Sequence, residues 1–101
     1  MAIIRGTTPT IIFTFNEVSV SDITKAYLVI KQGDVSVIQK DISSATVGTD
    51  IRWTLSQEET LSLKRKPNAV IYCDWKLRDG TRGRSKTQTE SVTDSGVDEV
   101  I

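Results

Sequence analysis

Five segments of this sequence alternate apolar and polar side chains with a period of two residues. In residues 51–55, Ile51, Trp53 and Leu55 share one face, and the residues between them are polar. The other segments cover residues 10–15, 25–31, 35–41 and 68–78. A period of two is expected of a β-strand that buries one face and exposes the other. The alternation therefore constrains the chain to a fold built from strands.

Short turn signals connect these segments. Gln32-Gly33-Asp34 predicts a hairpin between residues 25–31 and residues 35–41. Residues 25–31 are apolar on both faces, which indicates a central strand. The turn Asp79-Gly80 leads into residues 82–92, which are polar on both faces and rich in Ser and Thr. We expect that last segment to be an edge strand, or a strand completed by a neighbour.

One helical signal interrupts the strand pattern in the sequence LSQEETLSL. Ser56 can cap a helix, and Glu59, three residues later, can supply the other half of a capping box. Pro67 follows too closely for a long helix. We therefore predict one or two helical turns over residues 56–63, crossing between two sheets.

Short strands, frequent turns and one crossover predict an all-β fold, an immunoglobulin-like antiparallel β-sandwich with one short helical crossover turn. No alternation of strand and helix indicates a parallel sheet. The chain has 101 residues, enough for one domain, which we place at residues 1–93. Trp53 and Trp75 lie on the apolar faces of their segments and are predicted to pack in the core.

Residues 94–101 form a predicted tail after the sandwich domain. The tail carries three acids, Asp94, Asp98 and Glu99, and no base, and it ends in Val100 and Ile101. Apolar side chains in a polar tail have no local partner. We expect them to dock on their own domain or on another chain.

Composition argues against several classes of function. The chain has 13 basic and 13 acidic residues, no histidine and one cysteine, so an internal disulfide is excluded and a zinc site is disfavoured. Its carboxylates do not cluster, and Cys73 is expected to be a small buried residue, so we predict no enzyme, no metal and no cofactor. No apolar segment is long enough to span a membrane. The N-terminus does not resemble a secretory signal, and we expect synthesis in a cytoplasm.

A basic cluster in residues 64–86 is the strongest candidate for binding. Eight of the 13 basic residues lie there: Lys64, Arg65, Lys66, Lys76, Arg78, Arg82, Arg84 and Lys86. In a hairpin, Lys76 and Arg78 would face some of the bases that follow the turn. The resulting stripe could contact the acidic tail of a neighbouring subunit, bind a phosphate backbone, or remain a solvated strand face.

Three stretches resemble a known group of proteins: RGTTPTIIFTF at residues 5–15, WTLSQEETLSL at residues 53–63, and an ending that runs from Asp79-Gly80 to DEVI at residues 98–101. They are similar to small proteins encoded among the virion structural genes of phages and prophages. The β-sandwich of that group is similar to the N-terminal domain of the upper baseplate protein family. The resemblance implies a non-enzymatic component of the tail, baseplate or neck that assembles as a symmetric multimer.

From these observations we expect a phage virion protein, made in the host bacterial cytoplasm, that forms a homo-oligomer or acts as an adaptor for other phage structural proteins. Three surfaces are predicted to make the contacts. They are an N-terminal arm, residues 2–8, with Arg5, Thr7 and Thr8; the basic hairpin, with Lys76, Arg78, Arg82 and Arg84; and the tail, with Asp98, Glu99, Val100 and Ile101. The alternative is a small nucleic-acid-binding module that uses the basic stripe at residues 64–86.

Overall fold

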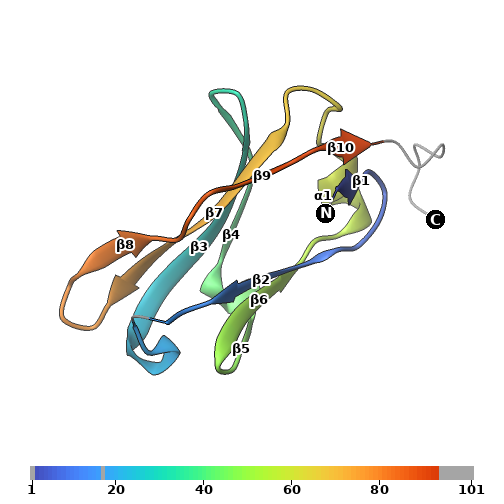
Figure 1. Cartoon of the computed structure of the whole chain (residues 1–101). Coiled ribbons are helices and arrows are strands. Elements are labelled where there is room, and N and C mark those ends of the chain that lie inside the picture. The colour runs from blue at the N-terminus through green and yellow to red at the C-terminus, as the bar shows by residue number, and fades with distance from the viewer. Residues whose placement is uncertain (1, 17, 94–101) are drawn as a thin grey trace.

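The protein is an all-β sandwich with one short α-helix (Figure 1). The computed structural model describes residues 2–16 and 18–93. The described strands are β1 (Ile3–Ile4), β2 (Thr10–Thr14), β3 (Ile23–Gln32), β4 (Val35–Asp41), β5 (Thr46–Val47), β6 (Asp50–Thr54), β7 (Ala69–Leu77), β8 (Arg82–Arg84), β9 (Gln88–Glu90) and β10 (Val92–Thr93). The helix is α1 (Gln57–Leu61), and two 3-10 turns cover Val20–Asp22 and Ile42–Ser44.

The larger sheet has the order β4-β3-β7, and β8 and β9 pair in succession with the other edge of β7. All of these pairs are antiparallel. The predicted hairpin between residues 25–31 and 35–41 is confirmed, and Gly33 occupies its turn with a φ of 65°. The strand predicted to be central, β3, has a neighbour on each side.

The smaller sheet has the order β2-β6-β5 and lies opposite the larger one (Figure 1). β2 and β6 are antiparallel, so Ile11 faces Trp53 and Phe13 faces Ile51 across the pair. These four side chains are buried, and the residues between them are more exposed, as the period of two predicts.

The core fills the space between the two sheets. Leu28 and Ile30 of β3 and Ile71 and Cys73 of β7 supply one side, and all four are at most 1% exposed. Trp53 supplies the centre of the other side; its indole lies edge-on to Phe13 at 5.8 Å and donates a 2.8 Å hydrogen bond to the carbonyl of Asp41. The core position predicted for Trp53 is confirmed.

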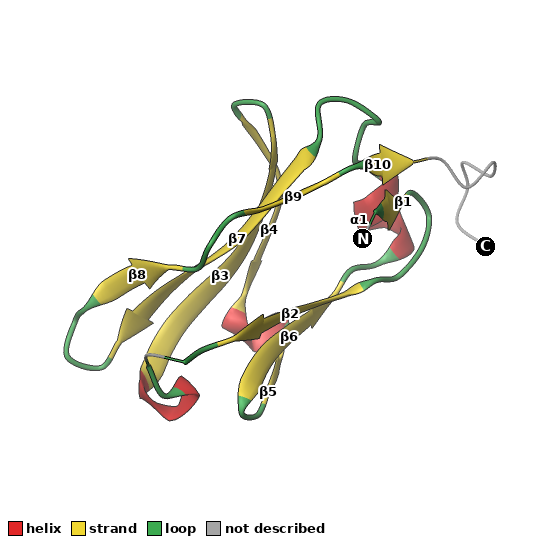
Figure 2. Cartoon of the chain, in the orientation of Figure 1, coloured by secondary structure: helices red, strands yellow, loops and turns green. Residues whose placement is uncertain are grey.

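Helix α1 connects β6 of the smaller sheet to β7 of the larger sheet (Figure 2). The predicted capping box is present: the backbone N–H of Glu59 donates to Ser56 Oγ at 3.1 Å, and the backbone N–H of Ser56 donates to Glu59 Oε1 at 2.8 Å. The predicted short crossover helix is therefore confirmed.

The segment predicted as one strand over residues 82–92 is divided into β8, β9 and β10. The ladder on β7 changes at Ser85, whose Oγ accepts a 2.8 Å hydrogen bond from the backbone N–H of Cys73. The side chain thus takes the place of a backbone carbonyl at that position, and β8 ends. β10 then leaves β7 and forms a parallel pair with β1.

Candidate functional site

Three basic side chains stand in one row across the outer face of the larger sheet. Lys25 on β3 lies beside Lys76 on β7, and Lys76 lies beside Arg82 on β8. We call these three residues the basic row. All three side chains are exposed, and none of their charged groups forms a hydrogen bond or ion pair with another of residues 2–16 and 18–93. Because adjacent strands are about 4.8 Å apart, three positive charges originate within about 10 Å.

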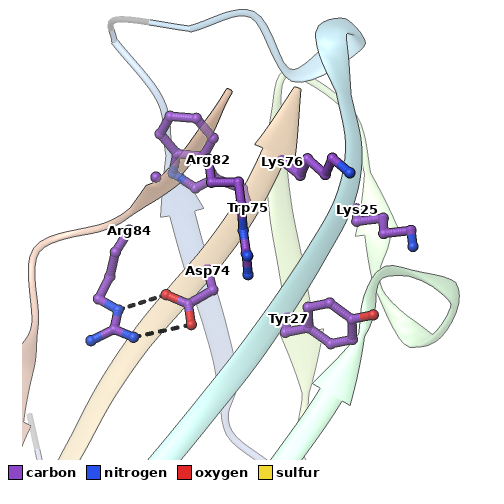
Figure 3. A pocket seen from close by; sticks show the side chains of 8 residues that line it. Lys25, Tyr27, Asp74, Trp75, Lys76, Arg82 and Arg84 are labelled. Atoms are coloured by element: carbon purple, nitrogen blue, oxygen red, sulfur yellow. Dashed lines mark hydrogen bonds and ion pairs between the residues drawn. The ribbon is translucent and has the colours of Figure 1, made fainter. Parts of the chain in front are cut away.

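The next row of the same face is neutralised within the chain. Arg84 donates from Nε to Asp74 Oδ1 at 2.6 Å and from Nη2 to Oδ2 at 3.2 Å (Figure 3). Its guanidinium also lies 4.1 Å from the centroid of the Tyr72 ring. Tyr27 on β3 completes this row. Arg84 is therefore held by its own sheet, whereas the basic row is available to a partner.

The two rows line an open hollow of about 560 Å³ on the sheet face. Its walls carry four cationic groups, from Lys25, Lys76, Arg82 and Arg84, and the carboxylate of Asp74, with Tyr27 beside them (Figure 3). Since Asp74 already accepts from Arg84, the remaining charge of the hollow is that of the basic row. The chemistry of this surface suits an extended anionic ligand, which can contact several cations at once.

The turn between β7 and β8 sets the register that produces the row. Gly80 takes a φ of 92°, which favours glycine, and the side chain of Asp79 accepts a 2.8 Å hydrogen bond from the backbone N–H of Thr81. Gly83 then lies opposite Trp75, and its missing side chain leaves room for the indole against β8. These contacts place Arg82 beside Lys76.

The structure divides the predicted basic stripe into parts with different surroundings. Lys76 and Arg82 are brought together as expected. Arg78 is directed to its own chain, where its backbone N–H donates to the carbonyl of Asp22 at 3.0 Å and its Nη2 donates to the carbonyl of Ser21 at 3.4 Å. Residues 64–66 precede the opposite end of β7 and do not belong to the row. Lys25 was not predicted as a site residue.

The N-terminal arm was predicted to be free to contact a neighbouring subunit, and the structure corrects this. Hydrogen bonds hold the arm against its own domain. Arg5 donates to the carbonyls of Leu63 at 2.8 Å and Leu61 at 3.0 Å, at the C-terminal end of α1. The Thr60 hydroxyl accepts from the Gly6 N–H at 2.9 Å and donates to the carbonyl of Thr7 at 2.8 Å.

Ile3 pairs with Val92 and is fully buried. In this structure residues 2–8 are therefore not a free arm, although Thr8 is exposed. The other predicted contact residues, Asp98, Glu99, Val100 and Ile101, lie outside the described residues.

Cys73 is buried on the inner face of β7. Burial, together with the neighbouring Asp74 carboxylate, raises the pKa of the Cys73 thiol from 9.0 to about 12. The group is therefore a neutral thiol at physiological pH, in agreement with the structural role predicted for it.

Residues 2–16 and 18–93 contain neither a cluster of metal ligands nor a helix that could span a membrane. The described Cys, Asp and Glu side chains form no group of three or more that could hold a metal ion. In the same part of the chain, no helix has both the length and the apolar character that a membrane span requires. In comparisons with known proteins, no protein-family model and no curated protein sequence matches this chain.

Proposed function

We propose that this protein is a non-enzymatic structural component of a phage virion, in the tail, baseplate or neck, and that it assembles through the basic row. The partner is an acidic surface of another copy or of another phage structural protein. The observation that carries the proposal is the juxtaposition of Lys25, Lys76 and Arg82, three exposed cations without a partner among the described residues.

Electrostatics supports a binding role for this row. Like charges directly opposite each other on adjacent strands destabilise a sheet. An acid in the row would remove this repulsion, as it does in the next row of the same face, where Asp74 faces Arg84. A local arrangement that opposes stability is expected where a surface is used for function. An acidic partner would turn this repulsion into attraction.

The sequence supports the proposal that the assembly is a phage virion. The stretches at residues 5–15 and 53–63 resemble small virion proteins of phages, and both belong to the sandwich itself. Such a protein would be made in the host cytoplasm and act in the virion. Its contribution is a rigid sheet that presents charges at fixed spacing.

We also propose that the sandwich is of the immunoglobulin-like type. Two facing sheets around one core, the hairpins β3-β4 and β7-β8, and the crossover through α1 support this class. In an experimental structure, sheets packed at about 30° to each other are expected, whereas a nearly orthogonal packing would contradict the assignment.

The basic row also suggests the alternative function, binding of a nucleic-acid backbone, because three unpaired cations can contact phosphates. The chain's formal net charge of zero favours the protein partner. The two functions differ in what the protein binds and are separated by one set of variants.

The test compares a row variant, Lys76→Glu with Arg82→Glu, with a control, Lys64→Glu with Lys66→Glu. Both change the net charge equally, but the control residues lie outside the basic row. We expect light scattering at low salt to show an assembly for the wild type and the control, and a monomer for the row variant. An assembly that survives in the row variant would contradict the proposed contact. Tight, salt-dependent binding of arbitrary DNA or RNA by the wild type would favour the alternative.

A further inference from the structure

The hollow that contains the basic row adjoins a second hollow, and Trp75 and Arg84 line both of them. This hollow, of about 600 Å³, lies beside β2 and β8, and its lining mixes apolar side chains, among them Phe13, Phe15 and Trp75, with polar and basic ones. We call it the aromatic hollow, after Phe15 and Trp75, whose rings meet edge-on at 6.5 Å. Both rings are only partly buried. The β8 end of the sandwich thus offers adjacent cationic and apolar surfaces.

The sequence contains one segment with the complementary chemistry. Residues 94–101 carry three acids and no base, and Val100 and Ile101 follow directly after Asp98 and Glu99. Asp98 and Glu99 carry charges opposite to those of the basic row, and the two apolar side chains that follow them suit the aromatic rings of the neighbouring hollow. An extended segment of this length spans about 27 Å, enough to contact both surfaces.

The same copy is not placed to make this contact. β8 and β10 lie at opposite ends of the sandwich (Figure 1). Glu90 pairs with Ala69 at the start of β7, and Lys76 is seven residues further along β7, a distance of about 23 Å. The chain passes Glu90 while running away from Lys76. From Thr93, the five residues to Asp98 span about 17 Å even when fully extended.

We propose that residues 94–101 of one copy bind the β8 end of a second copy. Asp98 and Glu99 contact the basic row, and Val100 and Ile101 enter the aromatic hollow. This inference rests on the proposed function and specifies its partner. Because the two contacting surfaces belong to opposite ends of the sandwich, the interface is heterologous, and repeated contacts close into a ring or extend into a filament.

Complementation between two defective chains tests the inference. The row variant is Lys76→Glu with Arg82→Glu, and the tail variant is Asp98→Lys with Glu99→Lys. We expect each variant alone to be monomeric, with association weakened about tenfold to a hundredfold. In an equimolar mixture, the intact tail of the row variant can bind the intact row of the tail variant. The reversed tail of the tail variant can also bind the reversed row of the row variant, because these charges are again opposite. The expected product is therefore an assembly in which the two variants alternate, with a mass above the 11.2 kDa of a single chain.

A chain that carries all four substitutions provides the reciprocal test, because its reversed tail and row attract each other again. We expect this chain to regain assembly. If the reversed charges prevent folding, which tryptophan fluorescence would reveal, neutral variants (Lys76→Gln with Arg82→Gln, and Asp98→Asn with Glu99→Gln) replace them in the mixture.

The outcomes separate the inference from the proposed function. A wild type that is monomeric at every concentration would remove the proposed function and the inference together. A tail variant that assembles like the wild type, or a mixture that remains monomeric, would overturn the inference and leave assembly through the basic row standing.

Discussion

Trp75 lies directly opposite Gly83 across β7 and β8, and its indole occupies the space where a Cβ atom at position 83 would stand. A Cβ atom there would lie 2.2 Å from Cζ2 of the indole. The contact joins the inner face of the larger sheet to the strand that carries Arg82 and Arg84. It therefore holds the outer face in the register that produces the basic row.

Gly83→Ala is expected to destabilise the protein by about 1–3 kcal/mol, because the added methyl group must displace the indole or separate the two strands. Urea unfolding followed by tryptophan fluorescence measures the effect. Gly48→Ala is the matched control, since a Cβ atom at Gly48 meets nothing within 4 Å. Equal stability of the two variants would contradict the role assigned to Gly83.

Lys76→Gln is expected to stabilise the isolated chain at low salt by about 0.2–1 kcal/mol, because Lys76 faces Lys25 on one side and Arg82 on the other. The gain should disappear at high salt, which screens exposed charges. Urea midpoints at two salt concentrations check this under conditions that keep the protein monomeric. Lys64→Gln, outside the row, should change the midpoint little; a loss of stability in Lys76→Gln would mean that the row is not repulsive.

Glu59→Gln is expected to lower stability at neutral pH more than at acid pH. Desolvation raises the pKa of Glu59, but the hydrogen bond from the Ser56 N–H and the ion pair with Lys40 at 3.0 Å outweigh it and hold the pKa below 4.5. A lowered pKa in the folded state contributes stability above about pH 4.5, and that stability is lost as the pH falls.

Free energies of unfolding at pH 7 and pH 3 measure the loss. Glu58→Gln is the control, because Glu58 is an exposed acid in the same helical turn. A Glu59→Gln effect of equal size at both pH values would contradict this account of the carboxylate.

Cys73 is expected to resist thiol reagents while the protein is folded. With a pKa of about 12, about one thiol in ten thousand is ionised at pH 8, and the side chain is also fully buried. Modification by an aromatic disulfide reagent should be at least about a hundredfold faster in concentrated urea than in buffer. Rapid modification of the folded protein would show that β7 opens readily at Cys73.

Local patterns in the sequence predict most of the elements. The alternation at Ile51, Trp53 and Leu55 places β6 and its buried face, and Ser56 with Glu59 predicts the start of α1. These signals succeed because each depends on residues a few positions apart. The division of residues 82–92 was missed, because it depends on the hydrogen bond between Ser85 and Cys73, which lie in different strands.

The candidate site is less predictable, because it depends on pairing between distant strands. Lys76 and Arg82 are joined by a short hairpin and could be predicted, but Lys25 enters the row only through the pairing of β3 with β7. Arg5 contacts the end of α1, more than 50 residues away in the sequence. The prediction of an extended arm at residues 2–8 missed this contact. The order of charges along the chain does not predict which distant residues come into contact.

Sedimentation equilibrium of the wild-type chain, from micromolar to millimolar concentration and at low and high salt, measures whether the basic row holds copies of the protein together. We expect a mass that is a multiple of 11.2 kDa at low salt and that falls towards the mass of a single chain as salt screens the contact. A single mass of 11.2 kDa at every concentration and salt would contradict assembly through the basic row.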